Sequence, residues 1–165
     1  MDEKKKSAAL NQALKLLATR AHSRSELEAK LKSRGFDPEA VLKAVERLEQ
    51  LKLIDDRAFA GSCMESMGKR RPEGRIKTRI RLKQKGLSEE IVDEMMGSYD
   101  QMMLCAAAAE KKMRTLSGTP EAKRKKLLTF LKNRGFDWQT ISQTLSQLGA
   151  PLEEQDDQEE YPELD

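Results

Sequence analysis

The sequence predicts an all-α protein made of three tandem three-helix repeats, each like a helix-turn-helix unit. Residues with high helix propensity dominate the composition, while aromatic residues make up only 4%. One four-residue phrase occurs three times, at 34–37, 85–88 and 134–137. Because each unit of a repeat protein mainly contacts its neighbours, we expect an elongated stack, with a single globular bundle as the alternative.

The repeated phrase consists of a cationic residue, Gly, a large apolar residue and a helix-capping residue. Its glycines, Gly35, Gly86 and Gly135, are 51 and 49 residues apart. Glycine adopts the left-handed conformation that ends a helix without a steric penalty. The Asp or Ser two positions later can cap the next helix. The phrase therefore predicts the end of one helix and the start of another.

Apolar residues also recur at fixed distances from each glycine, at four positions before it and at six, ten and thirteen after it. These are Leu31, Leu82 and Leu131, then Val41, Val92 and Ile141, then Val45, Met96 and Leu145, then Leu48, Tyr99 and Leu148. The spacing indicates one buried face on each flanking helix. Thr78 is the exception, since the other repeats have Leu27 and Leu127 there; its helix carries Ile76 and Ile80 on another side.

The first repeat is predicted at residues 8–53, after a disordered N-terminus at 1–7. Its helices are expected at about 8–20, 23–34 and 38–52, and the first is expected to bury Leu10, Leu14 and Leu17. Ser23 and Glu26 fit a capping box at the start of the second helix, and Pro38 occupies the favoured first position of the third.

The second repeat, at 54–99, opens with two carboxylates, Asp55 and Asp56, which suit a helix N-terminus. Its helices are expected to end near Gly68, Lys85 and Gly97. The third repeat, at 100–149, is expected to contain helices at about 101–116 and 119–134 and a last one capped by Asp137.

Charge is distributed unevenly along the chain. Residues 150–165 hold eight carboxylates and no Lys or Arg, so the net charge of residues 1–149 is +11, against +3 for the whole chain. We expect the acidic tail to be disordered because it has little apolar surface to bury. The basic body favours a polyanionic or acidic partner.

The densest basic segment lies at 69–85, where Glu73 is the single anion. Its nine cations are Lys69, Arg70, Arg71, Arg75, Lys77, Arg79, Arg81, Lys83 and Lys85. On a helix, several of them stand four residues apart, a spacing at which like charges destabilise an isolated helix. We therefore predict that the segment binds phosphate groups, against the alternative of a solvated charged face.

A second basic cluster is less dense and is interrupted by Glu121, so solubility explains it as well as a partner contact does. It comprises Lys111, Lys112, Arg114, Lys123, Arg124, Lys125 and Lys126.

Catalytic signatures are missing. The sequence has no GxxxxGK[ST], GxGxxG or GxSxG pattern, so we expect no enzyme activity and no catalytic residue.

His22 has no companion ligand and is interpreted as structural, and Cys63 and Cys105 as reduced, buried thiols. We expect no cofactor, no metal and no membrane insertion. The chain start lacks the apolar stretch of a secretory signal, which predicts a cytoplasmic protein.

Three groups of residues together resemble the RecX family, bacterial regulators of the RecA recombinase. They are His22-Ser23-x-x-Glu26-Leu27-x-x-Lys30-Leu31, then Leu53-Ile54-Asp55-Asp56-x-x-Phe59, then Gly74 followed by Lys85-Gly86-Leu87. The resemblance covers about residues 8–148. Two positions depart from the family pattern, since Arg75 stands where Pro is usual and Thr78 where an aliphatic residue is usual.

The resemblance implies an elongated, curved molecule that binds along the groove of the RecA–single-stranded-DNA filament. It implies a monomer that limits filament growth, strand exchange, ATP hydrolysis and co-protease activity, in recombination, DNA repair and the SOS response. Single-stranded DNA is the implied nucleic-acid partner, and double-stranded DNA is a further candidate. The residues alone leave two other functions open, a nucleic-acid-binding protein that acts without RecA and an adaptor that binds only proteins.

Overall fold

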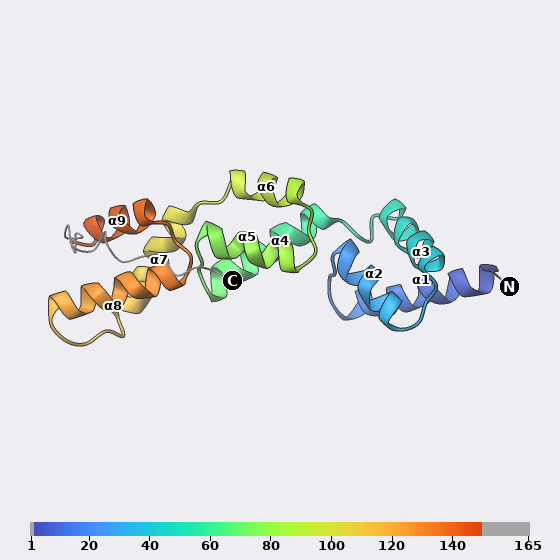
Figure 1. Ribbon diagram of the computed structural model, residues 1–165, viewed down its shortest axis with the longest axis horizontal. Helices are drawn as coiled ribbons and strands as arrows, with labels where there is room; N and C mark the ends of the chain where they lie inside the picture. The colour runs from blue at the N-terminus through green and yellow to red at the C-terminus, as the bar shows by residue number, and fades with distance from the viewer. Residues whose placement is uncertain (1, 150–165) are drawn as a thin grey trace. The chain divides into compact units, whose positions relative to one another are not determined.

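The computed structural model describes residues 2–149, and within this range all regular secondary structure is helical (Figure 1). The helices are α1 (Asp2–Thr19), α2 (Arg24–Ser33), α3 (Pro38–Gln50), α4 (Asp56–Arg70), α5 (Arg75–Gln84), α6 (Glu89–Gly97), α7 (Gln101–Met113), α8 (Pro120–Asn133) and α9 (Trp138–Gln147). They form three three-helix repeats, which confirms the predicted fold class. The disordered acidic tail predicted at 150–165 lies outside the described residues.

The glycine phrase has the same backbone geometry in all three repeats. Gly35, Gly86 and Gly135 have φ angles of 82°, 76° and 77°, in the left-handed region. The N–H of the residue after each glycine donates to the carbonyl oxygen five residues earlier, at 3.3 Å in each repeat. Asp37 and Asp137 then accept hydrogen bonds from the first turn of α3 and α9. The predicted helix end and helix start are therefore confirmed.

The apolar positions around each glycine are buried, as predicted. Eleven of the twelve are at most 9% exposed, and Leu148 is half-buried. Thr78, the polar exception, is 1% exposed and occupies the same core position as Leu27 and Leu127. The fixed spacing therefore identifies the buried faces on both sides of each turn.

The first helix differs from the prediction in two respects. It begins at Asp2, so residues 2–7, which were expected to be disordered, are helical; this stretch contains no Gly or Pro to oppose a helix. Leu14 was expected in the core but is 40% exposed. The buried stripe instead contains Ala9 and Ala13, and Ala9 packs in one cluster with small residues of α3. Small side chains allow the two helices to approach closely.

Residue contacts divide the chain into two compact units. Of the described residues, the first unit contains 2–63 together with Arg81–Met95, and the second contains Met64–Ile80 and 96–149. Helices α4, α5 and α6 therefore contribute residues to both units.

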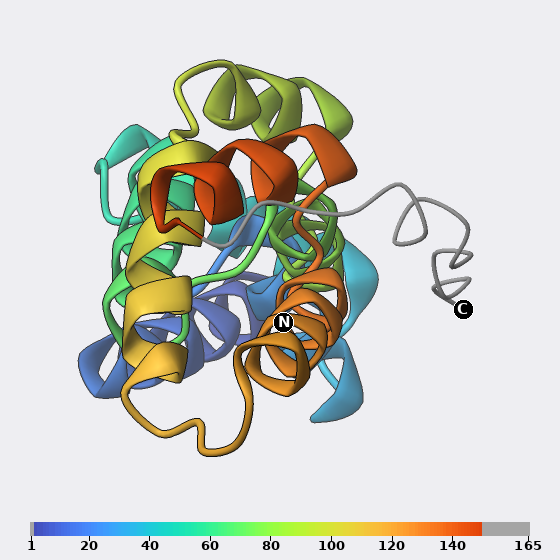
Figure 2. The same cartoon turned by 90° about the vertical axis from the view of Figure 1, so that its left-hand side faces the viewer.

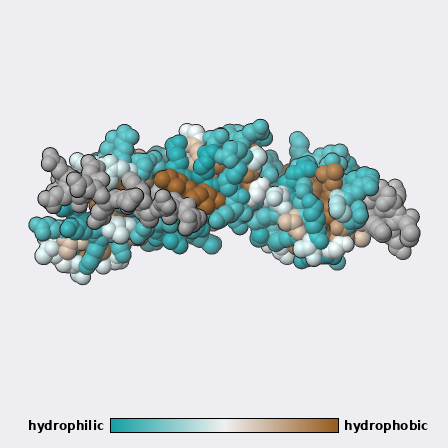
Figure 3. All heavy atoms as spheres, viewed as in Figure 1, coloured by the Kyte–Doolittle hydropathy of each residue, from teal (hydrophilic) through white to brown (hydrophobic). Residues whose placement is uncertain are grey.

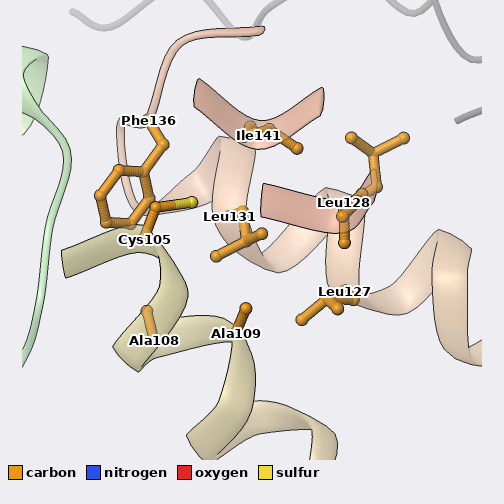
Figure 4. Packing of buried hydrophobic residues seen from close by; sticks show 9 residues of the cluster. Cys105, Ala108, Ala109, Leu127, Leu128, Leu131, Phe136 and Ile141 are labelled. Carbon is orange, nitrogen blue, oxygen red and sulfur yellow. The ribbon is translucent and has the colours of Figure 1, made fainter. Parts of the chain in front are cut away.

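Each unit has an apolar core. In the first, α1, α2 and α3 enclose a cluster of Ala13, Leu16, Leu27, Leu31, Val41, Val45, Leu48 and Ile54. In the second, α7, α8 and α9 lie around a common interior (Figure 2). The core there consists of Cys105, Ala108, Ala109, Leu127, Leu128, Leu131, Phe136, Ile141 and Leu145. Figure 4 shows Ala108 and Ala109 of α7 below Leu131 of α8, with Ala109 beside Leu127 and Phe136 next to Cys105.

Within each unit, successive repeats make one equivalent hydrogen bond. In the first unit, Ser23 Oγ donates to Lys85 O at 2.6 Å. In the second unit, Gly74 N donates to Arg134 O at 2.8 Å. Ser23 and Gly74 stand at the same distance before the glycine of their own phrase, and Lys85 and Arg134 directly precede theirs. The repeat therefore also specifies how the start of one second helix meets the end of the next.

Candidate nucleic-acid interface

The basic segment 69–85 runs from the end of α4 through a short loop into α5. Tyr99 holds this loop, because its hydroxyl donates to Glu73 O at 2.7 Å. The same hydroxyl lies 2.8 Å from Thr78 Oγ1. Thr78 therefore replaces an aliphatic core residue with a hydrogen bond to the tyrosine that fixes the loop. Burial is the largest cause of the raised pKa of Tyr99, and the raised pKa keeps its hydroxyl protonated.

Six of the nine cations are exposed, namely Lys69, Arg70, Arg71, Arg75, Lys83 and Lys85. The other three, Lys77, Arg79 and Arg81, are half-buried. Lys77 is confined by the third repeat, since a Cβ atom on Gly135 would lie 2.7 Å from Lys77 Cγ. Helix α5 also carries Ile76 and Ile80, which are exposed. Figure 3 shows a mainly hydrophilic surface with a few hydrophobic patches.

The protein supplies part of the negative charge that the basic segment needs. In the second unit, Lys69 pairs with Glu65 at 2.6 Å and Arg71 Nε lies 3.3 Å from Glu73 Oε1. Arg75 also donates to a main-chain oxygen, Tyr99 O, at 3.3 Å.

In the first unit, Lys83 pairs with Glu89 at 2.5 Å and Lys85 with Glu26 at 3.4 Å. Exposed ion pairs each contribute at most about 1 kcal/mol, so a phosphate group can replace such a carboxylate at little cost. The intramolecular pairs explain why α5 tolerates its charge and still leave the segment able to bind an anion.

The second basic cluster is brought together only in part. Lys112, Lys125 and Lys126 line a groove of about 580 Å³ between the end of α7 and α8. Arg114 and Lys123 do not line it. Arg124 was predicted as a surface cation but is 8% exposed and counts among the buried residues of α8. Its position on α8 faces the interior of the fold, which the run of cations 123–126 concealed.

Sequence reasoning missed an aromatic residue at the centre of this surface. The Phe130 ring has Lys112 Nζ 5.3 Å from its centroid and Arg134 Cζ 4.8 Å from it. The two cations interact favourably with the ring. Aligning the repeats on their glycines could have found it, because the equivalent positions hold the cations Lys30 and Arg81.

His22 and Cys105 are buried, and Cys63 is half-buried. His22 is 2% exposed, its Nδ1 lies 3.0 Å from Glu26 Oε2, and burial lowers its pKa despite that hydrogen bond. Cys105 is buried, which raises its pKa to about 11, while Cys63 is half-buried. Among the side chains of residues 7–149, no three His, Cys, Asp or Glu gather as metal ligands. No helix within residues 2–149 is long and apolar enough to cross a membrane.

Family models match all three repeats. The first three-helix domain of RecX matches residues 9–48, the second matches 55–96 and the third matches 99–145. The chain belongs to the RecX family. It is 63% identical over 145 residues to the regulatory protein RecX of Chlorobaculum tepidum, covering 88% of this chain and 91% of that protein. The RecX of Chlorobium phaeobacteroides is 47% identical over 147 residues, covering 89% and 95% of the two chains. RecX proteins are regulatory proteins rather than enzymes, in agreement with the sequence prediction.

Solved RecX structures share the fold. The crystal structure of RecX from Lactobacillus salivarius aligns with a TM-score of 0.80 and 24% identity, over 89% of this chain and 98% of that one. A second RecX crystal structure aligns with a TM-score of 0.72 and 24% identity, over 86% and 72% of the two chains.

Proposed function

We propose that the protein regulates RecA, mainly as an inhibitor, by binding in the groove of the RecA–single-stranded-DNA filament. Binding there limits filament growth and so lowers strand exchange, ATP hydrolysis and co-protease activity in recombination, DNA repair and the SOS response. Membership of a family of regulatory proteins supports a regulatory role. The exposed cations of segment 69–85 support contact with a phosphate-rich filament.

Segment 69–85 is the proposed primary contact. Arg70 is exposed and makes no ion pair with a described carboxylate, so its charge is available to a phosphate. The carboxylates that pair with Lys69, Lys83 and Lys85 are intramolecular, and a phosphate can take their place. Counterions released from the DNA then favour binding at low salt.

RecA ATPase activity on single-stranded DNA tests the proposal directly. The protein is expected to lower the steady-state rate when it is added at amounts up to stoichiometric with RecA. A rate unchanged over this range would rule out filament regulation.

A charge reversal tests the proposed contact. Changing Arg75, Arg79 and Lys83 to Glu should weaken inhibition, because these cations share one row of α5. A matched control reverses three exposed cations of the first repeat, Lys15→Glu, Arg34→Glu and Arg47→Glu, and should retain it. Circular dichroism and urea unfolding must show both variants folded. Equal inhibition by the two would move the contact away from α5.

A further inference from the structure

A small hollow in the second unit combines an apolar floor with a cationic rim. It lies among the end of α4, the C-terminal half of α7 and α8, and has a volume of about 200 Å³. We call its apolar lining residues, Pro72, Ala108 and Phe130, the floor, and its lining cations, Arg70, Lys111, Lys112 and Arg134, the rim; Thr115 completes the lining. The hollow lies outside segment 69–85 except for Arg70 and Pro72.

The rim concentrates positive charge without a carboxylate, since no acidic residue lines the hollow. Arg70 and Lys111 are exposed, and neither pairs with a carboxylate of the described residues. Lys112 and Arg134 are positioned by Phe130, and Arg134 Nη1 also donates to Pro72 O at 3.3 Å. Four cations that converge on one hollow repel one another, and an anion bound between them removes that repulsion.

The floor selects among anions. An inorganic phosphate or a carboxylate would contact the cations but would make no apolar contact with the floor. A nucleotide uses both parts, because its phosphate contacts cations while its base packs on an aromatic ring or a guanidinium plane. The hollow is smaller than the roughly 300–1,000 Å³ of sites that enclose a whole small ligand, which favours one unit of a polymer.

The adjoining groove extends the same chemistry. It shares Lys112 and Phe130 with the hollow and adds Lys125 and Lys126 as further cations. Phe130 therefore borders two neighbouring depressions, each with cations on its edge. A single strand that places one nucleotide in the hollow can place the next along this groove.

We propose that this hollow is a nucleotide subsite for single-stranded nucleic acid, with Arg70 and Lys111 on the phosphate and the Arg134–Phe130 stack beneath the base. The inference rests on the proposed function in one respect: the single strand that enters the hollow would be the DNA of the RecA filament. It adds a contact in the third repeat, separate from the α5 row.

Binding of a fluorescein-labelled oligothymidylate to the full chain, without RecA, tests the subsite by anisotropy. The double variant R70A/K111A should bind at least about tenfold more weakly. The magnitude of the slope of log K against log salt should fall by about 0.7, because the one phosphate of the subsite is no longer neutralised. The control R114A/K123A removes two charges from the same unit but neither residue lines the hollow or the groove. The control should stay within about threefold of the parent, and equal losses of affinity in both variants would overturn the proposal.

Phe130→Leu tests the base contact. Leucine keeps an apolar side chain against the core but removes the aromatic face, so oligothymidylate binding should weaken at least about fivefold. An oligonucleotide carrying 5-iododeoxyuridine should crosslink to the peptide that contains Phe130, as identified by mass spectrometry. Crosslinks confined to 75–85, with unchanged binding by Phe130→Leu, would overturn the subsite.

The alternative occupant is a carboxylate of a protein partner. If R70A/K111A binds DNA like the parent but no longer binds RecA alone, the hollow is a protein contact and the proposal is wrong. Inhibition of RecA without a crosslink at the hollow would refute the subsite and leave the proposed function intact. A crosslink at the hollow without any effect on RecA would support the subsite and refute the proposed function.

Discussion

Replacing Gly74 with Ala should disrupt the junction between the second and third repeats within the second unit. A Cβ atom at this position would lie 1.9 Å from Gly135 O and 2.3 Å from Phe136 N, both main-chain atoms. Because ordinary contact begins at 3.4 Å, the two backbones must separate by about 1.5 Å. The hydrogen bond from Gly74 N to Arg134 O, now 2.8 Å, cannot survive that displacement.

The expected cost follows from the broken hydrogen bond. Its net contribution is about 1 kcal/mol, and a carbonyl left without a partner or water adds about 1–3 kcal/mol. We therefore expect Gly74→Ala to destabilise the second unit by about 2–4 kcal/mol, a large part of the roughly 5–15 kcal/mol that holds a domain folded. Urea unfolding followed by circular dichroism measures this destabilisation, and hydrogen exchange should show faster exchange at the third-repeat turn.

Gly61→Ala is the matched control. Gly61 lies inside α4, and a Cβ atom there would meet no atom within 4 Å. Alanine should stabilise this helix by about 0.5–1 kcal/mol. If Gly74→Ala unfolds within about 0.5 kcal/mol of the parent, which is well below the cost expected from one broken hydrogen bond, the close approach of the two repeats is not what requires glycine.

Three further predictions concern buried polar groups. Tyr99→Phe removes the hydroxyl shared by Glu73 O and Thr78 Oγ1 and should cost about 1–3 kcal/mol in urea unfolding; an unchanged midpoint would show that the loop does not depend on it. Burial lowers the pKa of His22 from 6.5, so the unfolded chain binds more protons as the pH falls below 6.5, and stability should decrease there. Thermal melting between pH 7 and 5 measures this decrease, and His22→Gln, which cannot titrate, should show a weaker pH dependence. The pKa of Cys105, about 11, keeps its thiol protonated at pH 8, so alkylation read by mass spectrometry should be slower than at Cys63, and equal rates would contradict its burial.

The features that sequence predicted well are local. A left-handed glycine and a cap two residues later depend on a few consecutive residues, so the three turns could be placed without knowing what surrounds them. Thr78 shows the limit, because its role depends on Tyr99, 21 residues away. The buried face of α1 shows a second limit of sequence prediction, because the leucines and the alanines of this helix both recur at helical spacing. Only the small residues of α3 decide between them.

The sequence predicted which residues make up the basic segment of the candidate site, but it did not predict the partners of those residues. Segment 69–85 was evident from its charge, whereas the pairing of Lys85 with Glu26 joins residues 59 positions apart. The burial of Arg124 likewise depends on which face of α8 meets the core. Phe130 carried no signal by itself, because a lone aromatic residue on a helix is most often a core residue. The cations that surround it come from α4, α7 and the turn after α8, which only the fold brings together.

The equivalent hydrogen bonds between repeats use main-chain oxygens as acceptors, so these bonds do not depend on the side chain of the acceptor residue. Lys85 O and Arg134 O are present whatever side chain those residues carry. The side chains add contacts of their own, since Lys85 pairs with Glu26 of the first repeat and Arg134 lies beside Phe130 and donates to Pro72 O. Substitution at either position removes one side-chain contact and changes the charge offered to a partner, but the main-chain hydrogen bond between repeats can still form. The surface of such a chain can diverge one repeat at a time without rebuilding its architecture.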